Sequence, residues 1–275
     1  MAHFFFLRSL VLGTLAGGLL AFPREAAQSA RAGMTAFAGG VIPALLPFTA
    51  CVLLLTAGRT LPLSLLTLLA LPGGSPTGAR LLRDAGLRRE AALGCAARTG
   101  GMSFLFFLST LSGWLQDPAA ARLLLAAHVS AGLLASLCSP ERPRGRVTLP
   151  NMTLPQALFA AAQAMLGATA CAAFGAAAAR VAACALPGLP PLLLALGQSA
   201  LEVTGGVRAL IAQHAPLPLL AAATGFTGLG ILLQNAAYWQ ESGVSLGALT
   251  KTALLRAGLS AALVWIYSGI FRLFR

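Results

Sequence analysis

The chain has 275 residues, of which 57% are hydrophobic and only 9% are charged, and its mean hydropathy is +0.81. Soluble domains carry about 25% charged residues, so this chain has too little polar surface for a water-soluble fold. The net charge of +12 comes mostly from arginines at segment ends and in short loops, where basic residues mark cytoplasmic loops and meet anionic lipid. Composition therefore predicts an all-α polytopic membrane protein in a lipid bilayer and argues against a nucleic-acid partner.

Apolar runs of about 20 residues, the length that crosses a bilayer core, recur along the chain. The first could pass for a signal peptide. Arg8 follows the first phenylalanines, however, and no clean small-x-small cleavage site comes after it, so we expect a retained helix followed by an interfacial segment, together residues 1–37. We predict about seven full spans, at residues 4–22, 38–57, 91–112, 119–138, 154–182, 217–236 and 252–273.

Two further apolar segments, residues 60–72 and 189–201, are too short to cross a membrane. Each would be about 20 Å long as a helix. Each is followed by a glycine-containing break and then by a short, more polar helix that carries arginine. Irregular backbone at membrane depth is tolerated only where it is buried in protein or lines a cavity. We therefore predict two re-entrant helical hairpins, at residues 60–88 and 188–213.

The polar linker at residues 139–153 carries three arginines, which predicts a cytoplasmic position. It separates two halves with the same order of elements, namely span, hairpin, span, span. "TGAR" (77–80) and "RTGGMSFLFFL" (98–108) in the first half correspond to "TGGVR" (204–208) and "ATGFTGLGILL" (223–233) in the second. Each half crosses the membrane an odd number of times, so the second is inverted. Inverted repeats with broken helices are typical of secondary transporters.

The first predicted repeat, residues 38–138, contains the candidate ligands Ser75, Thr77 and Arg80. Serine is a good N-cap and Pro76 suits the first helical position. The free N–H groups at the start of such a helix attract anions, and Arg80 follows one turn later. The alternative is that Ser75 only caps the helix and that the arginines face the cytosol.

The second predicted repeat, residues 154–275, contains Glu202, whereas the other acidic residues can be placed in loops or at interfaces. A carboxylate inside a membrane costs several kcal/mol unless it is paired, hydrated or protonated. Such acids are by default functional candidates, as ligands of an ion, a proton or a substrate. The alternative is a structural partnership with Arg208. The polar neighbours at this predicted hairpin tip, also candidate ligands, are Gln198, Ser199 and Thr204.

The remaining polar residues within spans allow two interpretations each. Gln234 and Asn235 either line the pathway or cap a helix at the interface, and Asn235 is included among the candidate substrate ligands. His128 lies in a span without a nearby acid, which favours a helix–helix hydrogen bond over a proton relay. The five cysteines lack metal-site spacing, so we predict buried small hydrophobes and no metal site.

Signatures of catalysis are absent from the sequence. It has no glycine-rich phosphate loop that ends in Lys-Ser/Thr, no Gly-x-Ser-x-Gly elbow and no His/Cys ligand cluster. We therefore expect a protein that is not an enzyme and has no cofactor. Transport by such a protein would run downhill, on a coupling ion gradient or with a partner.

Four segments resemble a known family: "GVIPALLPFTACVLLL" (40–55), "GGSPTGARLLRDAGL" (73–87), "LEVTGG" (201–206) and "GFTGLGILLQ" (225–234). They are similar to the sporulation integral membrane proteins of the YlbJ type. These carry the nucleoside-recognition, or Gate, domain in two copies, with a fold considered similar to concentrative nucleoside transporters. The resemblance implies a bacterial cytoplasmic membrane, specifically the outer forespore membrane, and movement of dipicolinic acid during spore formation.

The sequence thus predicts a transporter of a small anionic solute, with dipicolinic acid as the leading candidate. The solute would bind between the two hairpin tips and move by alternating access. The alternatives are a nucleoside or other small-solute carrier, and a non-transporting membrane scaffold. Because many carriers with such hairpins form multimers, a homo-oligomer is a further expectation.

Overall fold

The computed structural model describes residues 2–139 and 144–273, so residues 140–143, near the start of the predicted 139–153 linker, lie outside the described residues. The described chain is helical almost throughout, which confirms the all-α part of the predicted fold class. Its two short strands, β1 (Thr60–Pro62) and β2 (Arg146–Thr148), pair antiparallel with Leu61 opposite Val147. This pairing fastens the middle of the linker to the start of the first predicted hairpin.

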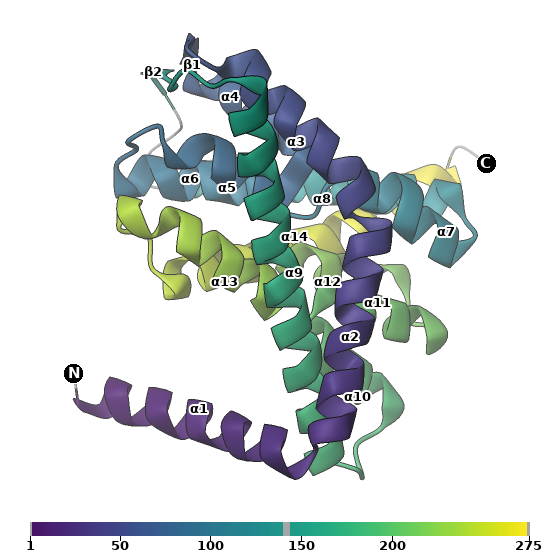
Figure 1. Cartoon of the computed structure of the whole chain (residues 1–275). Coiled ribbons are helices and arrows are strands. Elements are labelled where there is room, and N and C mark those ends of the chain that lie inside the picture. Colours follow the sequence, from purple (N-terminus) through teal and green to yellow (C-terminus); the bar gives the residue numbers. More distant parts are fainter. Residues whose placement is uncertain (1, 140–143, 274–275) are drawn as a thin grey trace.

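The N-terminal region forms two helices that meet at a sharp bend. Helix α1 (Ala2–Ala21) and helix α2 (Pro23–Gly40) diverge by 102°. Proline begins α2 at a position where its missing N–H costs nothing. Helix α1 extends away from the rest of the molecule, whereas α2 runs alongside α9 (Leu154–Ala185) (Figure 1). The predicted interfacial segment at the end of residues 1–37 is therefore a helix that packs against α9.

The first half of the chain after α2 begins with helix α3 (Ile42–Thr56) and ends with helix α8 (Pro118–Leu137). Between them lie a broken helix pair and a helix interrupted at residues 100–103. The intervening elements are α4 (Leu63–Ala70), the 3-10 turn η1 (Leu71–Gly73), α5 (Gly74–Arg83), α6 (Arg89–Thr99), the π-helical turn η2 (Phe106–Leu111) and α7 (Ser112–Leu115).

The second half repeats this order. The long helix α9 comes first and the long helix α14 (Leu246–Leu273) comes last. Between them lie the broken pair α10 (Pro191–Leu201) and α11 (Val203–Ala212), then α12 (Leu217–Phe226), α13 (Gly228–Trp239) and the 3-10 turn η3 (Gln240–Ser242). Thr227, with a φ of 68°, separates α12 from α13 as residues 100–103 interrupt the corresponding helix of the first half.

Helix length and composition support a membrane protein. Within the described residues, four helical segments are long and apolar enough to cross a membrane: Pro118–Leu137, Leu154–Ala185, Leu217–Ser242 and Leu246–Gly269. The bent pair α1 and α2 raises the number to five. The predicted count of seven is not confirmed, because α3 has only 15 residues and the predicted span 91–112 divides at Gly100 and Gly101, where the helix ends.

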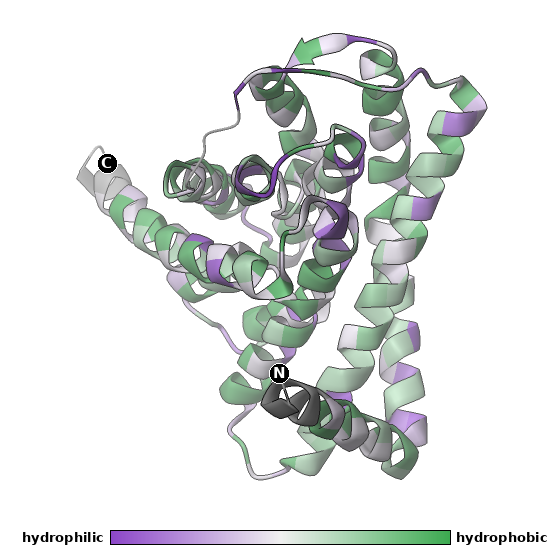
Figure 2. Ribbon diagram, turned by 90° about the vertical axis from the view of Figure 1, so that its left-hand side faces the viewer, coloured by the Kyte–Doolittle hydropathy of each residue, from purple (hydrophilic) through white to green (hydrophobic). Residues whose placement is uncertain are grey.

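The outward faces are apolar, as lipid contact requires. Hydrophobic residues predominate along most helices (Figure 2). Large side chains that point outward include Phe159 and Leu166 on α9 and Trp265 on α14, each more than 70% exposed. A water-soluble monomer rarely exposes such extended apolar surface, so these faces suit a bilayer.

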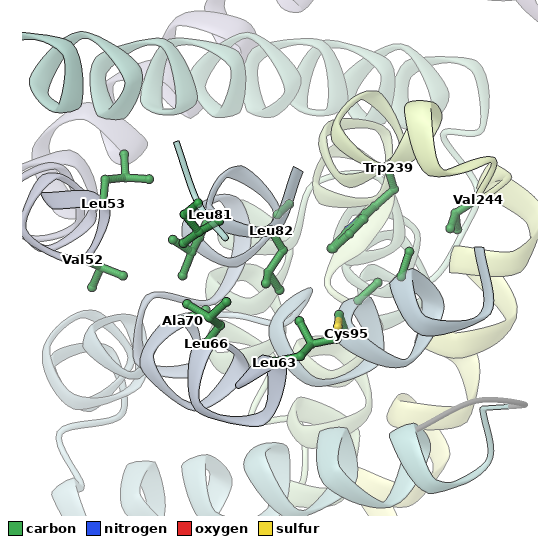
Figure 3. Packing of buried hydrophobic residues seen from close by; sticks show 14 of the residues in the cluster. Val52, Leu53, Leu63, Leu66, Ala70, Leu81, Leu82, Cys95, Trp239 and Val244 are labelled. Atoms are coloured by element: carbon green, nitrogen blue, oxygen red, sulfur yellow. The ribbon is translucent and has the colours of Figure 1, made fainter. Parts of the chain in front are cut away.

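The largest internal cluster joins the two halves. Side chains from α3, α4, α5 and α6 converge with Trp239 at the end of α13 (Figure 3). Trp239, Leu66 and Leu82 are fully buried. Because α13 belongs to the second half and the other helices to the first, this cluster fixes the second half against the first broken helix pair.

Candidate functional site

The first broken pair turns at Gly74 and Ser75. Gly74 has a φ of +56°, and the N–H of Ser75 donates to the carbonyl oxygen of Gly101 at 2.8 Å. The Ser75 hydroxyl donates to Oδ1 of Asn235 at 2.9 Å. The predicted capping role of Ser75 is therefore wrong for its side chain, which bonds to a helix of the other half instead.

The second broken pair turns at Glu202, whose backbone is extended between α10 and α11. One carboxylate oxygen accepts from the N–H of Thr204 at 2.8 Å and the other from the N–H of Gly205 at 2.6 Å. Glu202 is thus the N-cap of α11, a position where negative charge is favoured. Its side chain is buried, and no ion pair joins it to Arg208 among the described residues.

The two turns meet at a pocket, which we name the central pocket. It encloses about 530 Å³ of atom-free space, its open mouth included. Its walls come from α2, α3, α9 and α13, from the two turns and from the interruption at 100–103. Among the described residues that line it, Glu202 is the only charged one. The polar lining consists of Ser75, Ser103, Glu202, Thr204, Thr227 and Gln234.

A second pocket lies on the other side of the Glu202 turn, toward α2. We name it the α2 pocket; it encloses about 460 Å³ of atom-free space, also counted with its mouth. Glu202 and Thr204 line both pockets, and Gln198 and the exposed Arg208 line the α2 pocket. The Glu202 turn therefore forms the partition between two cavities.

The predicted site residues separate into those at the pockets and those elsewhere. Ser75, Glu202 and Thr204 line the central pocket, Gln198 lines the α2 pocket, and Asn235 supports the first turn by binding Ser75 and the carbonyl of Gly100. These contacts bring five of the eight predicted residues to the two turns or their pockets.

The other three are engaged in local contacts. Thr77 shares a 2.6 Å hydrogen bond with Thr49 on α3. Arg80 forms a 2.8 Å ion pair with Asp84 one turn away and does not line the central pocket. The hydroxyl of Ser199 donates to the carbonyl of Leu196. The arginine expected to bind an anionic substrate is thus paired near the end of α5.

Three polar lining residues were not among the predicted ligands. The Gln234 amide donates to the carbonyl of Ala164 at 3.2 Å, which holds its side chain between α13 and α9. Ser103 and Thr227 belong to the two interruptions that divide the helices of each half. The glycine-containing repeats at 98–108 and 223–233 mark both places, but there we predicted continuous spans.

The contact between Ser75 and Asn235 predicts energetic coupling between the halves. Ser75→Ala and Asn235→Ala, made together, should destabilise the protein by about 0.5–1.5 kcal/mol less than the sum of the single changes, since both remove one hydrogen bond. Thermal unfolding of the purified variants measures this coupling. The pair Thr77→Val and Asn235→Ala shares no hydrogen bond and serves as the additive control. Additivity for Ser75 and Asn235 would contradict the contact.

Comparison with known proteins gave no relatives: no protein-family model matches the sequence, and no curated protein or solved structure was found to be similar to it. Within the described residues, no group of three or more His, Cys, Asp or Glu side chains is placed to hold a metal ion. Functional reasoning therefore starts from the pockets themselves.

Proposed function

We propose that the protein is a membrane transporter that binds a small solute in the central pocket, between the turns of its two broken helix pairs. One observation carries this proposal: a buried carboxylate and several hydroxyl and amide groups converge where both helix pairs are unwound. Unwound helices in corresponding positions of two repeats are the binding sites of many secondary transporters. In this proposal the two pairs are re-entrant hairpins, the two halves are inverted repeats, and access alternates between the two sides.

The charge of the central pocket favours an uncharged solute or one that enters with a cation. No lysine, arginine or histidine is among its lining residues, and Arg80, the arginine predicted as a ligand, is paired with Asp84. An anion would meet the Glu202 carboxylate in a site of low dielectric, where like charges repel strongly. The lining of the pocket therefore favours an uncharged solute, whereas the sequence alone favours an anionic one.

The aromatic residues in the lining favour a solute with a flat ring. Phe37 and Phe106 both contribute to the walls of the central pocket, and aromatic side chains stack on flat rings or meet them edge to face. Hydroxyl and amide groups beside them can bind ring substituents. A nucleoside has a flat ring, polar substituents and no charge, and is the solute class that the chemistry of this lining suits best. Dipicolinic acid, also flat, is the second candidate and needs a cation to accompany it.

Uptake into proteoliposomes that contain the purified full chain tests this proposal. We expect saturable accumulation of labelled uridine, with dipicolinate competing only when a divalent cation is present. Saturable dipicolinate uptake that uridine does not inhibit would instead establish an aromatic dicarboxylate carrier. The absence of uptake of both compounds by folded protein would contradict the proposal for these two solutes and favour the scaffold alternative, in which packing glycines matter and pocket residues do not.

A further inference from the structure

Arg256 lies in the middle of α14 and is only 3% exposed. Its guanidinium donates to the hydroxyl of Thr227 at 3.4 Å, and its Nε–H has no hydrogen-bond partner. No ion pair joins Arg256 to a carboxylate in the part of the chain that the structure describes. Burying a charged guanidinium without a counter-charge is strongly unfavourable, so the protein requires a negative partner at this position.

Arg256 lines a small cavity behind the central pocket, which we name the arginine pocket. It lies between the first turn, the interruption at 100–103, α8 and α14, and its cavity volume of about 10 Å³ leaves room for one particle of about the size of a water molecule. Two of its lining residues carry positive charge, Arg98 and Arg256. Among its lining residues, all of which belong to the described chain, none is aspartate or glutamate.

His128 adds a second unused donor to this pocket. Its Nε2 accepts a hydrogen bond from the backbone N–H of Met102 at 3.1 Å, so in the neutral ring the proton resides on Nδ1. The Nδ1 atom is buried and has no partner. Buried donors are normally satisfied, and here two of them, on His128 and Arg256, line the same cavity.

The positions of these two residues correspond in the two halves. His128 is the eleventh residue of α8 and Arg256 is the eleventh residue of α14, the helix that closes each half. Each bonds to the interruption in its own half: His128 to Met102 and Arg256 to Thr227. Equivalent positions on α8 and α14 therefore supply the two donors of the arginine pocket, and these two helices pack against each other.

We propose that the arginine pocket binds a small inorganic anion of about the size of chloride. The anion accepts hydrogen bonds from the Arg256 guanidinium and from His128 Nδ1–H and compensates the positive charge of Arg256 and Arg98. A water molecule could accept the same hydrogen bonds but would leave the charge uncompensated. Thr227 lines the central pocket and binds Arg256, so this anion site lies directly behind the wall of the proposed solute site and does not depend on the identity of the solute.

The experiment compares the thermal stability of the purified full chain in chloride and in gluconate, which is too large for this cavity, at constant ionic strength and pH. The unfolding temperature of the wild type should rise saturably with chloride, by about 5 °C when chloride exceeds its dissociation constant a hundredfold. Arg256→Gln should abolish the rise. Arg208→Gln removes an exposed arginine and should leave it unchanged. An equal rise in the Arg256→Gln protein, or no rise in the wild type, would overturn the proposal.

A second variant keeps the test decisive if Arg256→Gln does not fold. His128→Gln retains an acceptor for Met102 N–H but changes the donor that faces the anion, and should raise the half-saturating chloride concentration about tenfold, the equivalent of one hydrogen bond. Bromide in crystals of the wild-type protein supplies an independent measurement. An anomalous peak beside Arg256 and His128 would support the site, whereas bromide found only elsewhere would overturn it.

Discussion

Replacing Gly74 by alanine is expected to destabilise the fold by about 3–5 kcal/mol, from backbone strain and overpacking together. Gly74 has φ and ψ of +56° and −148°, a region that is almost restricted to glycine. A Cβ atom there would lie 2.6 Å from the carbonyl oxygen of Gly101 and 2.7 Å from the backbone nitrogen of Ser103. Because both are backbone atoms, neither can rotate away, and the first turn must separate from the interruption at 100–103.

Thermal unfolding in detergent measures this effect, with Gly39→Ala as the matched control. Gly39 is an exposed glycine in α2, and no atom lies within 4 Å of its Cβ position. Gly39→Ala should be neutral or slightly stabilising, because alanine favours helix. A Gly74→Ala protein as stable as the Gly39→Ala protein would show that the first turn does not pack on the interruption as described.

Replacing Glu202 by glutamine is expected to slow solute uptake about ten- to hundredfold while the protein remains folded. Glutamine has nearly the same shape and keeps one oxygen to accept from the N–H of Thr204, but it removes the only charge among the lining residues of the central pocket. A hydrogen bond to a charged group contributes about 1.5–3 kcal/mol, and each 1.4 kcal/mol is a factor of ten. If Glu202 instead binds a coupling cation, the same change removes the coupling.

Uptake by Glu241→Gln provides the control for charge loss in general. The Glu241 carboxylate is 66% exposed and pairs with Arg83 at 3.1 Å, and it is not among the lining residues of the central pocket. Its uptake should equal that of the wild type. Equal uptake by the Glu202→Gln and Glu241→Gln proteins would assign Glu202 to capping of α11 alone, with no part in transport.

Local sequence signals predicted the class of the protein and the positions of the two turns. The glycines and prolines at 72–76 and the polar residues around Glu202 break apolar helices in ways that sequence rules describe. The same signals predict the number of membrane spans less accurately. Residues 91–112 and 217–236 have the hydropathy of continuous helices. Their interruptions at residues 100–103 and Thr227 coincide with tertiary contacts to Ser75, His128 and Arg256.

Which residues form the site depends on where their side chains point, and the sequence does not give this information. Arg80 lies one turn from Ser75, but its ion pair with Asp84, four residues on, turns it away from the pocket. Ser75 satisfies an amide from the other half, Asn235, 160 residues distant. Arg256 carried a signal that could have been recognised, since an arginine inside a predicted span is costly and by default functional. The predicted span 252–273 contains this arginine.

The most direct test of the central claim is solute protection of a cysteine at Thr204, in a chain whose five native cysteines have been replaced. Thr204 is largely buried and lines both the central and the α2 pockets. Saturating uridine should slow labelling of Thr204→Cys by a water-soluble thiol reagent. It should leave unchanged the labelling of Gln213→Cys, at the exposed far end of α11. If uridine is transported but both positions react at the same rate with and without it, the solute does not bind between the two turns.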